Sequence, residues 1–163
     1  MRLTRRYRFS AAHRLHSELL SEAENRETFG KCNNPYGHGH DYVLEVTVRG
    51  AVDAETGLVA DVRRLDAVVR REVLDAFHMR NLNVDVAEFA GLVPTSENVA
   101  VVVERRLGRV WRREFPGSPA LDRIRIHETR RNIFEVAAKT AAEPGGAEER
   151  EESREAETEK SRL

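Results

Sequence analysis

The chain has 163 residues, of which 40% are hydrophobic and 34% charged, with a formal net charge of −1. This composition is typical of one globular domain with a hydrophobic core. No apolar run is long enough to span a membrane, so a membrane-embedded protein is not expected. Residues 143–163 hold eight glutamates against four lysines and arginines, a net of −4, which leaves +3 for the rest. A net charge of +3 on these residues is too small to indicate a nucleic-acid-binding protein.

Residues 1–142 are predicted to form the folded domain. Residues 143–163 contain almost no large apolar side chains and are predicted to be a disordered charged tail. Cys32 is the single cysteine, which excludes an internal disulfide, and the charged N-terminus does not resemble a secretory signal. We therefore expect a cytoplasmic protein.

Two strands are predicted first, because apolar side chains alternate there with a period of two. One face of the first strand carries Tyr7, Phe9, Ala11 and His13. One face of the second strand carries Tyr42, Leu44, Val46 and Val48. After a turn marked by Gly57, residues 58–62 are expected to extend a hairpin partner.

The next elements have helical periodicity. The apolar stripe of the first helix is Val62, Leu65, Val69, Val73 and Phe77. A second helix is predicted after Pro94, with Thr95 or Ser96 as its N-cap. Residues 124–126 and 133–136 then form two more strands. The order of elements predicts an α+β fold, with two helices packed on one face of a four-stranded antiparallel sheet.

Three histidines are predicted to form a metal site. His38 and His40 lie two residues apart in an extended segment, so their side chains point to the same side, and Gly39 between them has no side chain to crowd an ion. His13 ends the first strand on its inward face. If the two strands pair, the three imidazoles converge. Three neutral histidines that leave one coordination position open are typical of catalytic zinc.

The other histidines near these segments are not expected to be ligands. A His-x-His pair is by itself a weak signal, so neighbouring histidines need a separate reason to be included. His16 is predicted to be a solvated loop residue. His127 alternates away from the inward face that carries Ile124 and Ile126.

Several segments of the chain, in the same order, resemble the 6-pyruvoyltetrahydropterin synthase family. That family also contains the 6-carboxytetrahydropterin synthases of queuosine biosynthesis. The resemblance spans roughly residues 4–137, with the acidic tail outside it. The segments are Phe9–Leu15, Lys31–Tyr42, Asp53–Leu58, Asn81-Leu82, Pro94–Asn98 and His127–Thr129.

The resemblance implies the tunnelling fold. In that fold a four-stranded antiparallel sheet with two helices trimerises into a barrel, and two trimers stack into a homohexamer with active sites at subunit interfaces. The resemblance also implies 7,8-dihydroneopterin triphosphate as the small-molecule substrate and Zn²⁺ as the cofactor. The product is then 6-pyruvoyltetrahydropterin or 6-carboxytetrahydropterin.

The resemblance further implies roles for individual residues. Cys32, as a thiolate, acts as the catalytic base, and zinc and cations such as Lys31 would favour that thiolate. The polar residues that flank Cys32 argue against its being a buried hydrophobe. Glu128 follows a strand on the inward face, where its carboxylate pairs with the pterin 2-amino and ring N–H groups.

The segment after Pro94 also has a role in the family. Thr95, Ser96 and Glu97 match the family's segment that lines the pterin pocket. Helix capping is the alternative for Thr95 and Ser96, and the two roles are compatible.

One motif departs from the family pattern. Where the family usually has an Asp-His pair that assists the cysteine of a neighbouring subunit, this chain has His78-Met79. We expect His78 to relay the proton, oriented by Asp75 if the helix persists. The alternative is a histidine that contacts the exposed carbonyls at the end of a helix.

Three functions remain open. The first is a zinc-dependent pterin synthase, for which Asn33-Asn34-Pro35 looks more like the pyruvoyl type. The second is side-chain cleavage toward a 6-hydroxymethylpterin, a route associated with Glu in place of Cys32. The third, suggested by His78-Met79, is a non-catalytic or altered-specificity oligomer that binds pterin or zinc. Arg14, Arg26 and Lys31 are candidates for phosphate contact on charge alone.

Overall fold

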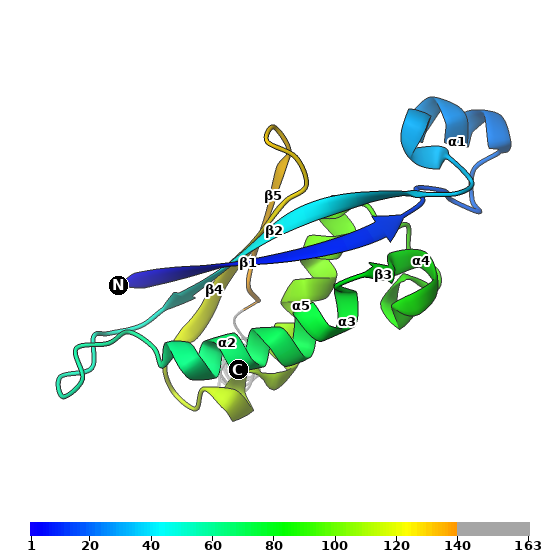
Figure 1. The fold of residues 1–163 in the computed structure, drawn as a ribbon. Coiled ribbons are helices and arrows are strands. Elements are labelled where there is room, and N and C mark those ends of the chain that lie inside the picture. Colours follow the sequence, from blue (N-terminus) through cyan, green and yellow to red (C-terminus); the bar gives the residue numbers. More distant parts are fainter. Residues whose placement is uncertain (140–163) are drawn as a thin grey trace, which may run out of the picture.

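The computed structural model describes residues 1–139, so the predicted tail at 143–163 lies outside the described residues. A five-stranded sheet with the spatial order β3-β1-β2-β4-β5 forms one layer, and helices form the other (Figure 1). The strands are β1 (Arg2–His13), β2 (His38–Arg49), β3 (Arg80–Asn81), β4 (Ala120–His127) and β5 (Ile133–Ala137). The sheet is mixed, and not four-stranded and antiparallel as predicted, because β3 pairs in parallel with the free edge of β1.

The two long strands β1 and β2 pair antiparallel along their whole length, which confirms the predicted pairing. Phe9 lies opposite Tyr42, and His13 lies opposite His38. The predicted apolar face of β2 is fully buried, with 0% exposure at Tyr42, Leu44, Val46 and Val48. The histidines therefore continue the face that forms the core.

The predicted hairpin partner at residues 58–62 is wrong. β2 already pairs with β1 on one edge and with β4 on the other, so it has no free edge to accept another strand. The segment after β2 instead forms a turn, in which the Asp53 N–H donates to the Leu58 carbonyl at 2.9 Å. Gly57 closes this turn with a φ of 71°.

Residues 1–139 contain five α-helices. They are α1 (Glu22–Phe29), α2 (Val62–Val69), α3 (Asp75–Phe77), α4 (Leu82–Asp85) and α5 (Ser96–Glu114). A π-helical segment (Arg70–Leu74) joins α2 to α3, and 3₁₀ turns occupy Gly30–Asn33 and Ala87–Phe89. No described helix combines the length and apolarity that crossing a membrane requires.

The first predicted helix is the continuous run from α2 to α3. Its fully buried residues recur every four positions, at Leu65, Val69, Val73 and Phe77. A regular α-helix has 3.6 residues per turn, so a strict spacing of four drifts around its axis. The wider π turn at Arg70–Leu74 counteracts this drift and keeps the stripe facing the sheet.

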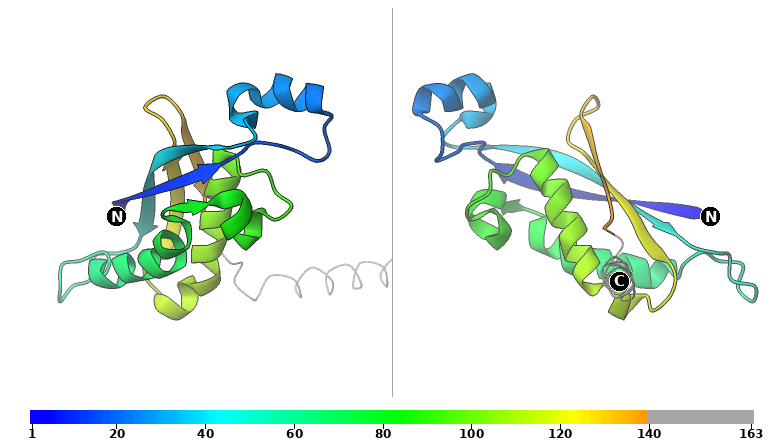
Figure 2. Two further views of the ribbon diagram at one scale, coloured as in Figure 1. Left: turned by 45° about the vertical axis from the view of Figure 1, so that its right-hand side comes forward. Right: turned by 180° about the vertical axis from the view of Figure 1, so that it is seen from behind.

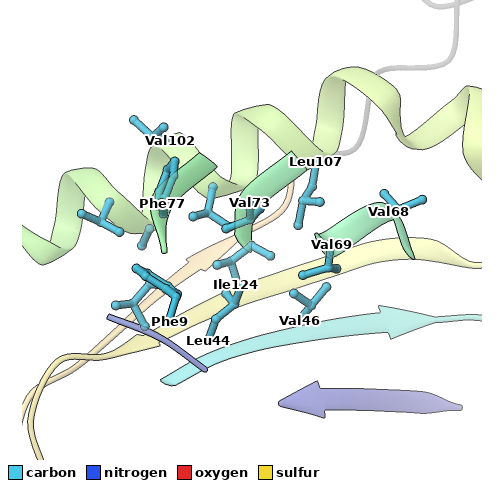
Figure 3. Close-up of a cluster of buried hydrophobic side chains, with 14 of the residues drawn as sticks. Phe9, Leu44, Val46, Val68, Val69, Val73, Phe77, Val102, Leu107 and Ile124 are labelled. Atoms are coloured by element: carbon cyan, nitrogen blue, oxygen red, sulfur yellow. The ribbon is translucent and has the colours of Figure 1, made fainter. Parts of the chain in front are cut away.

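Both predicted helices pack on the same face of the sheet, as expected. Figure 3 shows Val73 of the first helix and Leu107 of α5 above Leu44 and Ile124 of the sheet. Helix α5 begins as predicted, because the Thr95 side chain caps it by accepting a hydrogen bond from the Asn98 N–H at 3.3 Å.

Helix α1 lies beyond the ends of β1 and β2, apart from the other helices (Figure 2). Its polar surface gives it little hydrophobic anchoring, so polar contacts hold it. Ser21 and Glu24 form a capping box at its start. Asn25 is 0% exposed, and its side-chain amide donates to the carbonyls of Ser17, Leu20 and Ser21.

Candidate active site

The structure brings the three predicted histidines together. His13 ends β1, while His38 and His40 open β2, and their potential ligand nitrogens all lie within 4.8 Å of one another. Nε2 of His13 is 3.1 Å from Nε2 of His38. The predicted convergence is therefore confirmed, and it follows directly from the register in which His13 faces His38.

His13 is held in the orientation that a metal ligand needs. Its Nδ1 lies 2.8 Å from the Pro94 carbonyl, which can only accept, so Nδ1 carries the proton and Nε2 is free to face the cluster. Burial lowers the pKa of His13 to about 4, so the ring is neutral near pH 7. A neutral imidazole is the form that binds metals. The role of Pro94 could not be predicted from the sequence, because a backbone carbonyl has no side-chain signature.

The cluster also has buried nitrogens that lack partners within residues 1–139. His40 Nε2 is buried and forms no hydrogen bond. His38 Nδ1 is also buried without a partner, but Nε2 is the nitrogen of that ring that faces His13. Oε1 of Glu128 lies 3.7 Å from His40 Nε2, beyond hydrogen-bonding distance. Buried polar atoms without partners are rare in proteins. Together with the nitrogen donor set, they fit a bound transition-metal ion.

Gly37 allows the chain to enter β2 beside the end of β1. It has a φ of +71°, and a Cβ atom at this position would lie 2.9 Å from the His13 carbonyl oxygen. A larger residue would therefore push His38 away from His13. A Cβ atom at Gly39 would make an ordinary 3.6 Å contact with the Ala11 carbonyl oxygen.

Cys32 lies in the 3₁₀ turn Gly30–Asn33 and is partly buried. Its carbonyl accepts a hydrogen bond from the Leu15 N–H at 2.9 Å, which fixes the turn next to the end of β1. Burial and the negative charge of Glu128 both raise the pKa of the thiol. Within residues 1–139, Lys31 does not offset these two effects, and the predicted favouring of the thiolate by zinc and nearby cations stays a prediction.

We expect the Glu128→Gln substitution to lower the pKa of the Cys32 thiol, because it removes the negative charge that disfavours the thiolate. At a given pH above neutrality the variant would then hold more thiolate than the wild type. Cys32 is the only cysteine in the chain, so a titration of thiolate ultraviolet absorbance reports this group alone. Glu97→Gln, an exposed carboxylate, is the control, and equal titration curves for all three proteins would contradict the prediction.

Of the predicted pterin-pocket residues, Glu128 and Ser96 lie together. The Ser96 hydroxyl donates to Glu128 Oε1 at 2.7 Å, and Ser96 is 3% exposed. Thr95 caps α5, so its alternative role is confirmed. Glu97 is exposed in the first turn of α5. The carboxylate of Glu128 is thus positioned beside His40 by a buried hydroxyl.

His78 does not occupy the environment expected from the sequence. The helix ends at Phe77, and His78 Nδ1 accepts a hydrogen bond from the Ser10 N–H at 3.1 Å. Asp75 does not orient it, because this carboxylate lies 3.8 Å from Arg70. The alternative contact with helix carbonyls is also wrong. His78 is exposed at the edge of β1, followed by Met79 in the left-handed region with a φ of 59°.

Of the predictions for the two remaining histidines, the one for His16 is wrong and the one for His127 is confirmed. The His16 side chain is only 15% exposed, and its Nδ1 lies 3.0 Å from the Asn33 amide nitrogen, so the predicted solvated position is wrong. His127 points away from the cluster as predicted, with its Nε2 3.2 Å from Glu45.

This fold and cluster define a small α+β protein with a three-histidine site suited to a metal ion, beside a thiol and a carboxylate. A family model described as 6-pyruvoyl tetrahydropterin synthase matches residues 2–139, and the chain belongs to this family.

Named relatives agree with this assignment. The chain is 45% identical over 131 residues to the 6-pyruvoyl tetrahydrobiopterin synthase of Poecilia reticulata, a match that covers 80% of this chain and 86% of that protein. The human protein of the same name is 42% identical over 131 residues, covering 80% and 87%. The solved structure of Caenorhabditis elegans 6-pyruvoyl tetrahydropterin synthase superimposes with a TM-score of 0.77 and 46% identity, covering 84% and 94%.

Proposed function

We propose that this chain is a zinc-dependent lyase that converts 7,8-dihydroneopterin triphosphate to 6-pyruvoyltetrahydropterin, with release of inorganic triphosphate. The observation that carries this proposal is the convergence of His13, His38 and His40 in a member of this family, with Cys32 and Glu128 beside them. The names of the relatives favour the pyruvoyl product over the 6-carboxy product.

Each part of the site has a separate task. His13, His38 and His40 hold Zn²⁺, which supplies positive charge that acidifies substrate hydroxyls and opposes the effect of Glu128 on the thiol. Glu128 accepts hydrogen bonds from the pterin 2-amino and ring N–H groups through its two oxygens. Ser96 restricts the rotation of that carboxylate by its hydrogen bond to Oε1.

Cys32 is the proposed base. As a thiolate it accepts the proton from the side-chain carbon next to the pterin ring. Its turn is tied to the end of β1 through the Leu15 N–H, so the backbone of Cys32 is fixed next to the residues that follow His13. Fixing the base relative to the substrate is a large part of the rate gain in proton transfer.

His78 is proposed to assist the thiol of a neighbouring subunit. Its Nδ1 accepts from the Ser10 N–H, so in the neutral ring Nε2 carries the proton and can donate it outward from the sheet edge. We expect His78→Ala to lower kcat about 100-fold, at the lower end of the contribution of an acid–base group, without loss of zinc. Initial rates and metal analysis provide the measurements. Full activity in this variant would remove His78 from the mechanism.

We further propose that residues 1–142 form one domain that assembles into a homohexamer, with sheets of three chains closing a barrel and two trimers stacking. The family resemblance supports this arrangement, and one face of the sheet carries no helix within the described residues (Figure 1). Light scattering should then give six times the chain mass of 18.6 kDa. A monomeric mass at micromolar concentration would contradict the assembly. A cytoplasmic location remains a prediction.

One experiment tests the reaction. Zinc-loaded protein is incubated with 7,8-dihydroneopterin triphosphate, and the product is identified by mass spectrometry. A 6-carboxy product or a 6-hydroxymethylpterin would replace the proposed product with one of the neighbouring reactions. Stoichiometric zinc with no loss of substrate would contradict the enzyme proposal and support the non-catalytic alternative suggested by His78-Met79.

A further inference from the structure

A basic cavity of about 310 Å³ lies where the end of β1, helix α1 and the turn that carries Cys32 meet. Its volume is at the lower end of the range that small-molecule sites commonly occupy. Among its lining residues are three cations that are candidates for phosphate contact on charge alone: Arg14, Arg26 and Lys31. Residues distant in sequence thus form one positively charged surface.

The charge of this cavity is not neutralised within the described chain. Glu22 is the one carboxylate among its lining residues. Within residues 1–139, the side chains of Arg26 and Lys31 form no ion pair, whereas Arg5 and many other arginines of the protein contact carboxylates. The Arg14 guanidinium donates to the Asn33 carbonyl at 3.1 Å. Cations gathered without partners repel one another, and a bound anion relieves that repulsion.

The cations are attached to a fixed framework. Arg26 follows Asn25, whose fully buried amide anchors α1. Asn33 is 6% exposed, and its amide donates to the Leu15 carbonyl at 2.9 Å, which fixes the rim that holds Arg14. Little ordering of the backbone is therefore needed when an anion binds, and such preorganisation raises affinity.

The lining of the cavity also includes direct sequence neighbours of two proposed active-site residues. Arg14 directly follows His13, and Lys31 directly precedes Cys32. We infer that this cavity binds a polyphosphate chain, and, resting on the function proposed above, that it holds the triphosphate of the substrate. Guanidinium groups bind phosphate oxygens in pairs, and a lysine ammonium adds a further charge-assisted hydrogen bond.

Binding of inorganic tripolyphosphate tests the cavity without turnover. The full-length protein is stripped of metal first, because tripolyphosphate itself binds divalent cations, and affinity is measured by calorimetry. Arg26→Gln should weaken binding about tenfold, as expected for loss of a hydrogen bond to a charged group. Glu22→Gln should tighten binding severalfold. Arg105→Gln, an exposed arginine of α5 outside this cavity, should have no effect.

Two results would overturn the inference: no binding of tripolyphosphate by the wild type, or equal affinity in the Arg26→Gln and Arg105→Gln variants. Circular dichroism of each variant verifies folding. Arg26 is exposed, so its replacement is not expected to unfold the protein.

Steady-state kinetics separates this inference from the proposed function. In an active enzyme, Arg26→Gln should raise KM for dihydroneopterin triphosphate about tenfold and leave kcat nearly unchanged. Wild-type turnover with no change of KM in the variant would reject the phosphate site and keep the function. Tripolyphosphate binding that depends on Arg26, without any turnover, would reject the function and keep the site.

Discussion

The His40→Ala variant is expected to lose bound zinc and to turn over dihydroneopterin triphosphate more than about 100-fold more slowly than the wild type. Changes in groups that merely orient metal ligands already cost 10- to 100-fold, and loss of one ligand of three should exceed this. His40 is a better target than His13, because His13 is 1% exposed and its removal would also leave a cavity in the core. Elemental analysis and initial rates provide the two measurements.

His127→Ala is the matched control for this experiment. His127 lies on the opposite face of the sheet, next to Glu45, so the variant should keep its zinc and most of its activity. Stoichiometric zinc in His40→Ala would show that the metal binds elsewhere. Loss of zinc in both variants would show that the effect comes from the sheet as a whole and not from the cluster.

The Cys32→Ala variant is expected to be slower by a factor of about 10² to 10⁴ while it retains zinc, because general base catalysis contributes rate gains of this size. The thiol lies outside the three-histidine cluster, so metal content should not change. Initial rates and elemental analysis on the same samples separate chemistry from metal binding.

Cys32→Ser is the companion variant, since a hydroxyl has nearly the size of a thiol but is a far weaker acid. Equal rate losses in the serine and alanine variants would indicate that the thiolate, and not the volume of the side chain, is required. Wild-type activity in Cys32→Ala would exclude this residue as the base and leave Glu128 as the nearby candidate.

The parts of the structure that the sequence predicts well depend on local periodicity. Alternation along β1 and β2 places every second residue on the inward face, so the histidines and the core residue Tyr42 had to share one side. The helical spacing and the capping residue Thr95 likewise placed α5 correctly. These signals are properties of neighbouring residues and need no knowledge of the rest of the fold.

The parts that the sequence does not predict depend on contacts between distant segments. The hairpin partner expected at residues 58–62 fails because β4 already occupies the second edge of β2. The Cys32 thiol responds to Glu128, which no local pattern connects to it. The environment of His78 depends on where the helix ends and on the edge of β1 that receives it.

The pairing of β1 with β2 has a consequence for how this site can change over evolutionary time. His38 and His40 share a face of β2 with Tyr42 and Leu44. One residue inserted or deleted between the histidines and Tyr42 would therefore turn either the imidazoles or the core side chains to the opposite face of the sheet. Length variation is therefore tolerated only outside these strands, as in the loop after β2. Point substitutions can remodel the chemistry, whereas the position of the metal ligands is inherited together with the hydrophobic core.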